Sequence, residues 1–238
     1  MIQLLKMDIK KLHWKSYLFG FVIINFAISS LVWLIVQEIN PTDLQAVYPN
    51  YPDYHFIYRF ILTIVRISTT IVAAIFMVDL IINEYKSKTI TVLFLYPLPR
   101  WKLLLSKILL VGVLTTIFFL ATIVVSFSLI YMANLYSPII TEQITSFLSL
   151  RLYLEVFIQA MVTAIIGFIP LFFGMVRKSV IATMVAAVVL AFNVYLPIHA
   201  PNNVEVYGSR PLISIILVVA GVAVVCRFIY RTSQRDIV

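Results

Sequence analysis

Long apolar stretches dominate this sequence and restrict the folds open to it. A helix needs roughly 20 mostly apolar residues to cross the hydrocarbon layer of a bilayer. Hydrophobic residues make up 62% of the chain and charged residues 12%, against about 45–50% and about 25% in soluble domains. The sequence therefore predicts an all-α, polytopic membrane protein with six transmembrane helices in a single transmembrane domain, residues 1–238. The expected spans are Tyr17–Val36, Ile57–Ile82, Ile108–Met132, Leu152–Met175, Ser179–Ile198 and Leu212–Tyr230.

The basic residues lie mainly between the apolar stretches, and every second connection between these stretches is rich in Lys and Arg. Cytoplasmic loops carry the excess of Lys and Arg, and 14 of the 18 basic residues lie on one predicted side. We therefore expect both termini in the cytoplasm. The net charge of +8, distributed in this way, favours contact with anionic membrane lipid and not with nucleic acid.

Residues 1–15 have the pattern of a helix that lies in the membrane surface. Ile2, Leu5, Ile9 and Leu12 recur at spacings of three and four residues, which places them on one helical face. We predict an N-terminal amphipathic interfacial helix. It serves either as a topogenic anchor or as an elbow helix that moves with the first span.

The basic loop 83–107 follows the second span and has a structure of its own. Its first part, Glu84–Tyr96, has the pattern of a short helix, which Pro97 and Pro99 then end. Two interpretations stay open: a docking surface for a soluble partner, or a basic loop that only fixes the topology.

Six residues in this segment resemble a motif of the permease subunits of ABC transporters of the type-2 exporter family. The matching residues are Glu84, Thr89, Pro97, Leu98, Arg100 and Lys107. Lys88 departs from the motif, because the family often has glycine there. The resemblance implies that Glu84–Tyr96 is a coupling helix that inserts into an ATPase, within the cytoplasmic coupling loop 83–107. It also implies coupling roles for Glu84, Thr89, Pro97, Arg100 and Lys107.

The resemblance further implies which proteins this chain assembles with and in which membrane it lies. We expect a pair of cytoplasmic ABC ATPase subunits, a second permease that is identical or similar, and a bacterial plasma membrane around them. ATP and Mg would be bound by the ATPase, and no cofactor by this chain. The function implied is an ATP-driven exporter. Because the outer loops are short, we expect an amphipathic or hydrophobic substrate, such as an antimicrobial or toxic peptide.

Catalytic and metal-binding motifs are absent from the sequence. There is no G-x-x-x-x-G-K-[ST] loop and no H-E-x-x-H, and the chain has 6 glycines in all. His13, His55 and His199 fall in three different segments. We therefore predict a non-catalytic subunit without a metal site. A membrane scaffold or sensor that relays a signal to a cytoplasmic partner remains the alternative function.

Two spans carry polar residues at helical spacing, which gives a polar stripe along each helix. The stripe of span four consists of Glu155, Gln159, Thr163 and Gly167, and that of span two of Arg59, Thr63, Arg66 and Thr70. Charged side chains inside lipid are costly and are usually functional. As candidates for the translocation path we take Arg59, Arg66, Thr70, Glu155 and Gln159. Arg66 and Glu155 either pair or share a cavity toward the outer leaflet, or the charged side chains extend to the headgroups.

Four further residues carry smaller expectations. Asp79, near the inner end of span two, is expected to reach a basic residue of the following loop. Pro170 in span four, and Asn193 and Pro197 in span five, are expected to interrupt their helices, and the outer end of span five is a candidate re-entrant segment.

Overall fold

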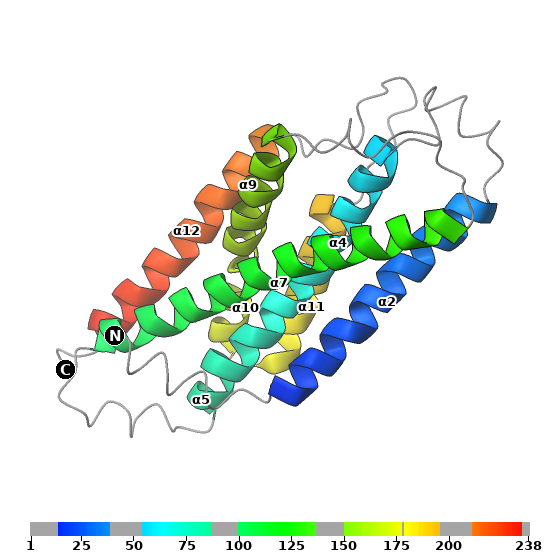
Figure 1. Ribbon diagram of the computed structural model, residues 1–238. Helices are drawn as coiled ribbons and strands as arrows, with labels where there is room; N and C mark the ends of the chain where they lie inside the picture. The colour runs from blue at the N-terminus through cyan, green and yellow to red at the C-terminus, as the bar shows by residue number, and fades with distance from the viewer. Residues whose placement is uncertain are drawn as a thin grey trace.

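The computed structural model describes residues 14–38, 54–86, 100–136, 150–177, 179–195 and 211–234. Apart from Gly167, Phe168 and Ser179 these ranges are helical, and they contain no strand (Figure 1). The helices are α2 (Trp14–Glu38), α4 (Tyr54–Met77), η1 (Val78–Ile82), α5 (Asn83–Lys86), α7 (Arg100–Tyr136), α9 (Leu150–Ile166), α10 (Ile169–Arg177), α11 (Val180–Tyr195) and α12 (Pro211–Gln234). The predicted interfacial helix over residues 1–15 lies almost wholly outside the described residues, as does most of the loop 83–107.

Each predicted span coincides with a helix or with two consecutive helices. Four segments are long and apolar enough to cross a membrane: Trp14–Ile35, Ile57–Ile82, Leu103–Tyr136 and Leu150–Val176. Val180–Tyr195 and Ser214–Tyr230 are apolar but shorter. The 16 residues of α11 reach about 24 Å at 1.5 Å per residue, less than the ~30 Å hydrocarbon layer. The all-helical class is confirmed, and the count of six crossings stays a prediction.

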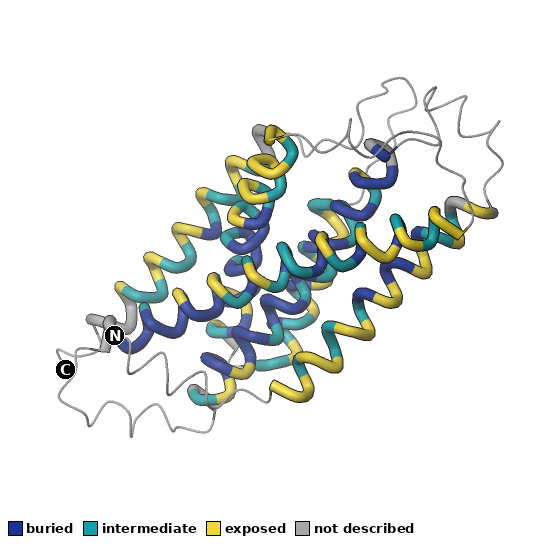
Figure 2. Tube along the Cα trace, in the orientation of Figure 1, coloured by how far each residue is buried: buried dark blue, intermediate teal, exposed yellow. Residues whose placement is uncertain are grey.

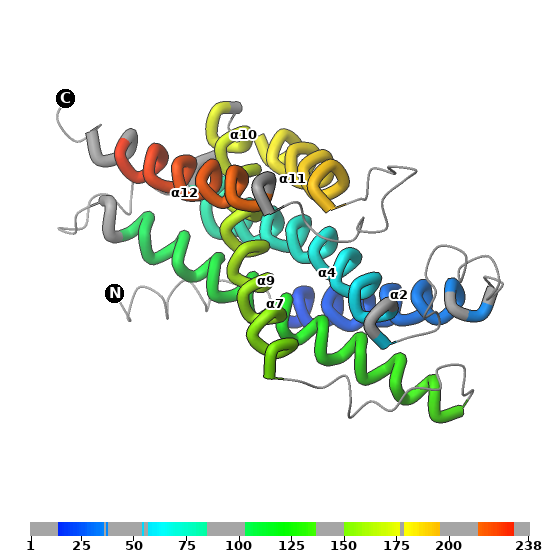
Figure 3. Tube along the Cα trace, turned by 90° about the horizontal axis from the view of Figure 1, so that it is seen from above, coloured from blue at the N-terminus to red at the C-terminus, as the bar shows by residue number. Residues whose placement is uncertain are grey.

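Successive helical units run in opposite directions through one slanted bundle. The beginnings of α2, α7 and α11 lie at the same end of the bundle as α5 and the last turns of α10 and α12 (Figure 1). The view from above places α4 between α11 and α7 (Figure 3), and α4 contacts both. The polar stripe of span two therefore lies on the most enclosed helix of the bundle.

The core follows α4 along its length, and the outer faces stay apolar. One buried cluster includes Ile57, Ile61 and Phe119, and a second includes Met77 and Leu171. The surfaces of the peripheral helices are largely exposed (Figure 2). Their exposed large side chains include Phe19, Phe26, Ile181 and Ile216. Exposed apolar surface on this scale indicates a membrane-embedded protein.

The fourth apolar stretch is interrupted, as its proline predicts. Gly167 and Phe168 separate α9 from α10, and Pro170 has no N–H to donate to the carbonyl of Ile166. The expectation for Asn193 is wrong: α11 continues to Tyr195, and the Asn193 amide donates to the Val189 carbonyl (2.7 Å). A side-chain bond to the preceding turn leaves the backbone ladder intact. Pro197 and the expected re-entrant segment lie outside the described residues.

Candidate functional site

The inner end of span two contains a wide helical turn directly before Glu84. The segment η1 is π-helical, and the Asn83 N–H donates to the Val78 carbonyl, five residues back. Such turns hold one more residue than an α-helical turn and occur often at functional sites. This turn sets the position of Glu84 and of the Leu80 carbonyl.

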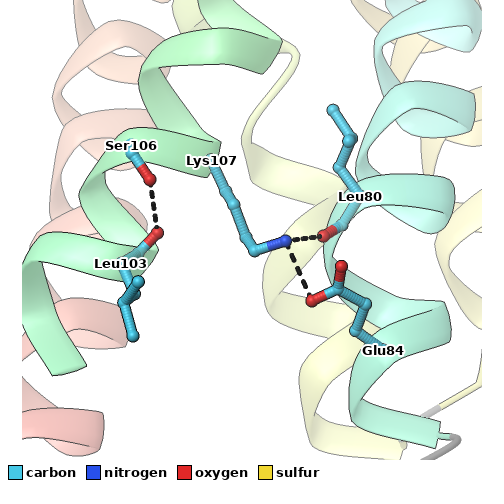
Figure 4. A network of polar contacts seen from close by, with 5 residues as sticks. All are labelled: Leu80, Glu84, Leu103, Ser106 and Lys107. Atoms are coloured by element: carbon cyan, nitrogen blue, oxygen red, sulfur yellow. Dashed lines mark hydrogen bonds and ion pairs between the residues drawn. The ribbon is translucent and has the colours of Figure 1, made fainter. Parts of the chain in front are cut away.

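Lys107 of α7 is buried against this turn and bound by both groups. Its Nζ lies 2.9 Å from Glu84 Oε2 and donates to the Leu80 carbonyl at 3.1 Å (Figure 4). The Lys107 side chain is 2% exposed and that of Glu84 13%. A buried charge is tolerated when it is paired and hydrogen-bonded. The ion pair therefore links the first turns of α7 to α5, directly after the second apolar stretch.

A second contact joins the same turn to α2. The Tyr17 hydroxyl donates to a carboxylate oxygen of Asp79, and the Asn83 amide donates to the other at 3.3 Å. Tyr17 and Asn83 are the described residues that bind this carboxylate. We expected a basic loop residue beside Asp79, and the side chains of Lys86, Lys88, Arg100 and Lys102 lie outside the described residues. We call this set the inner-end cluster, which consists of Tyr17, Asp79, Leu80, Asn83, Glu84 and Lys107.

Two of the five expected coupling residues meet in this cluster. The family motif contains Glu84 and Lys107, but their mutual contact is not readable from the sequence, because 23 positions separate them. Arg100 begins α7, and its side chain is not described. Thr89 and Pro97 lie outside the described residues. The Leu80 carbonyl carries no sequence signal, since any residue supplies one.

A second polar group lies deep in the bundle around Arg66. Arg66 is 6% exposed, and its guanidinium carbon lies 5.9 Å from the ring centroid of Tyr195 on α11. Thr70 donates to the Arg66 carbonyl at 2.8 Å. The Tyr195 hydroxyl lies beside the hydroxyls of Thr70 and Thr163. We call Arg66, Thr70, Thr163 and Tyr195 the mid-span cluster.

The depth of this cluster follows from helix geometry. At 1.5 Å per residue, Arg66 lies about 18 Å from Tyr54 and about 24 Å from Ile82 along the helix axis. Tyr195 lies about 22 Å from Val180 by the same measure. Arg66 therefore lies near the middle of its apolar stretch and meets Tyr195 at the end of α11. An ionised group within an apolar stretch needs protein or water around it.

The other path candidates lie nearer the surface. Arg59 and Glu155 are exposed, and Gln159 is half-buried. Glu155 attracts Arg66 electrostatically, but no ion pair joins them in the part of the chain that the structure describes. Arg66 is enclosed by the bundle, and the extension of the charged side chains to the headgroups stays a prediction. Sequence reasoning missed Tyr195, which belongs to no polar stripe of its helix.

Comparison with known proteins extends these observations to the family level. Residues 4–194 match the family model described as "ABC-2 family transporter protein". The chain is similar to YcbO, an uncharacterized protein of Bacillus subtilis (strain 168), with 28% identity over 216 residues, which cover 87% of this chain and 93% of YcbO. No solved structure matches the chain.

The family match places the chain among membrane permeases. No group of three or more His, Cys, Asp and Glu residues suited to a metal ion occurs among the described residues. Proteins of the matching family are membrane permeases that generally do not catalyse reactions themselves, and they typically pair with an ATPase. With its apolar, membrane-embedded helices and a match over most of its length, this chain belongs to the ABC-2 family of transporter proteins.

Proposed function

We propose that this protein is the permease subunit of an ATP-driven exporter whose motor is a separate ATPase. The observation that carries the proposal is the Lys107–Glu84 ion pair (2.9 Å) at the base of the loop 83–107, in a chain of the ABC-2 family. The pair fastens both ends of the loop that the family motif assigns to ATPase coupling.

The ion pair offers a route for motion from the loop to the bundle. A partner that displaces the loop moves α5 and α7 together, because Lys107 binds both Glu84 and the Leu80 carbonyl. The segment η1 continues directly into α4, which contacts α2, α7, α9 and α11. Small shifts of packed helices are a common form of transport-linked change. In this proposal they change access to the mid-span cluster.

The proposed topology has six crossings with cytoplasmic termini in a bacterial plasma membrane. The alternating direction of the helical units supports this arrangement (Figure 1). The concentration of Lys and Arg at the end of the bundle that carries α5 supports the orientation. The short helix α11 would cross where neighbouring helices cover its ends, since mismatch of a few ångströms has a modest cost.

The proposed assembly contains two permease copies and two ATPase subunits. The second permease is identical or similar to this one, because paired units enclose a path between them. ATP and Mg are held by the ATPase subunits.

The proposed substrate is amphipathic or hydrophobic, such as an antimicrobial or toxic peptide. A substrate of this kind partitions into the bilayer and reaches the bundle laterally. The broad exposed apolar faces of the peripheral helices suit such an approach.

Transport into inside-out membrane vesicles tests the proposal. Vesicles that contain this chain and its ATPase should accumulate a fluorescent amphipathic peptide when ATP is added, and not with a non-hydrolysable analogue.

Glu84→Gln should lower the ATP-driven rate about tenfold, since a charge-assisted bond worth about 1.5–3 kcal/mol is weakened. Ser106→Ala is the matched control: Ser106 is buried beside Lys107 and donates to the Leu103 carbonyl of its own helix (2.8 Å). Uptake that is independent of ATP contradicts the proposal.

A further inference from the structure

The mid-span cluster holds a buried cation without a counter-ion in contact. The Arg66 guanidinium is stabilised by the face of Tyr195 at 5.9 Å. Glu155 attracts it from an exposed position, and no ion pair links the two among the described residues. A cation–π contact offsets part of the desolvation of a charge and leaves its N–H donors unused. The cluster therefore carries net positive charge inside an apolar layer.

The cluster also contains a buried hydrogen-bond donor that has no acceptor among the described residues. Arg66 Nε is buried and has no hydrogen-bond partner within the described ranges. The Tyr195 hydroxyl is buried beside the hydroxyls of Thr70 and Thr163. The Thr70 hydroxyl already donates to the Arg66 carbonyl. Buried donors are nearly always paired in proteins. An acceptor would satisfy Arg66 Nε, and the charge of Arg66 selects an anionic one.

The surroundings restrict the rest of such a ligand. The helices that carry the cluster, α4, α9 and α11, are otherwise mainly apolar. A hydrated inorganic anion loses its water on reaching this depth and gains no apolar contact in return. An anion attached to an alkyl or other apolar chain gains that contact.

We propose that Arg66 and Tyr195 bind the anionic oxygen of an amphiphile, a phosphate or carboxylate headgroup, and that anionic amphiphiles are the substrate class. The inference rests on the proposed function, because it treats the cluster as part of the translocation path. It disfavours strongly cationic peptides, which Arg66 repels at close range.

Matched twelve-carbon amphiphiles test the sign of the recognised charge. The full-length protein in neutral detergent is titrated with dodecyl phosphate, dodecyltrimethylammonium and inorganic phosphate, and binding is followed calorimetrically. Dodecyl phosphate should bind at least about tenfold more tightly than either other probe, as one charge-assisted bond implies. Equal binding of the anionic and cationic chains overturns the inference. Inorganic phosphate that binds as tightly as dodecyl phosphate also overturns it, because no apolar chain is then recognised.

Three variants locate the binding. Arg66→Gln removes the charge, and Tyr195→Phe removes the hydroxyl but keeps the ring; they should weaken dodecyl phosphate binding about tenfold and about threefold respectively. Arg151→Gln, which alters an exposed arginine on α9, is the control for general attraction and should bind as the parent does. Equal weakening by Arg151→Gln and Arg66→Gln contradicts a site at the cluster.

Two further measurements keep the test independent of folding and of the proposed function. Arg66→Lys retains the charge at this depth, so it should fold and bind dodecyl phosphate more tightly than Arg66→Gln. If ATP-driven peptide uptake persists while no variant alters binding, the inference fails and the exporter proposal stands. If binding follows the expected order but ATP drives uptake of neither the peptide nor a fluorescent anionic amphiphile, the exporter proposal fails and the binding site stands.

Discussion

At the scale of single residues, buried polar side chains form contacts between the otherwise apolar helices of this bundle. Asn25 and Ser126 join α2 to α7, with the Ser126 hydroxyl donating to Asn25 Oδ1 at 3.2 Å. Lys107 joins α7 to the end of the second apolar stretch. In a membrane, apolar helix faces gain little by leaving lipid for another helix, because lipid is equally apolar. Polar contacts between helices therefore determine which helix faces pack together.

The Lys107–Glu84 pair should behave as a coupled unit in unfolding. Lys107→Met removes the buried cation that lies 2.9 Å from the Glu84 carboxylate and should lower the free energy of unfolding by about 3–5 kcal/mol. The double variant Lys107→Met/Glu84→Leu removes both charges and should recover a large part of that loss. Reversible unfolding in mixed detergent measures both. If the loss of stability in the double variant equals the sum of the losses in the two single variants, the pairing is contradicted.

The Asn25–Ser126 contact should contribute a smaller amount. Ser126→Ala should destabilise the protein by about 0.6 kcal/mol and by no more than about 1.7 kcal/mol, the range for interhelical bonds in membranes. The control is Ser128→Ala, which alters an exposed serine on the same helix that donates to the Val124 carbonyl of that helix. The same unfolding assay compares them, and an equal effect of both substitutions would mean that the interhelical bond contributes nothing.

At the scale of helices, two glycines permit close crossings. A Cβ on Gly221 of α12 would lie 2.5 Å from the backbone carbonyl oxygen of Ile165 on α9. A Cβ on Gly174 of α10 would meet Thr183 of α11 and, at 2.6 Å, Ile82 Cδ1. Small residues let helix backbones approach in membranes, so these crossings depend on the missing side chains.

Substituting these glycines should affect stability according to the space around each. Gly221→Ala should cost about 1–3 kcal/mol, because a backbone carbonyl cannot move aside as a side chain can. Gly20→Ala is the control: a Cβ added there would have nothing within 4 Å, and alanine in a helix interior gains about 0.5–1 kcal/mol over glycine. Thermal unfolding in detergent compares the two. A neutral Gly221→Ala would contradict the α9–α12 crossing.

The helices themselves were largely predictable, and their mutual contacts were not. Apolar runs determine where a helix lies, and Pro170 indicates where one breaks, since both follow from local chemistry. The π-helical turn at Val78–Ile82 has no such local signal. Tyr195 was not predicted as a partner of Arg66, because their meeting depends on how α4 and α11 pack.

At the scale of the whole molecule, the topology depends on whether α11 and α12 cross the membrane. The two helices have shorter apolar segments than the other four spans. If both cross, the segment between α10 and α11 lies inside and the segment between α11 and α12 lies outside. If neither crosses, both segments lie on one side.

Single cysteines decide between these topologies. In a Cys226→Ser background, which removes the one native cysteine, we place either Lys178→Cys or Glu205→Cys. A membrane-impermeant maleimide added to intact cells should label the cysteine at 205, and the cysteine at 178 should react only after the membrane is opened. Labelling of both from the same side would contradict six crossings.

The central claim is that this chain works only with a separate ATPase coupled to it through the loop 83–107. Its most direct test is ATP hydrolysis by the chain purified alone and by the chain purified with an ABC ATPase from the same cells. The account predicts no hydrolysis by the chain alone. In the complex it predicts hydrolysis that the transported amphiphile stimulates, with the stimulation lost in Glu84→Gln and kept in Ser106→Ala. An ATPase that does not bind the chain, or stimulation unaffected by Glu84→Gln, would contradict it.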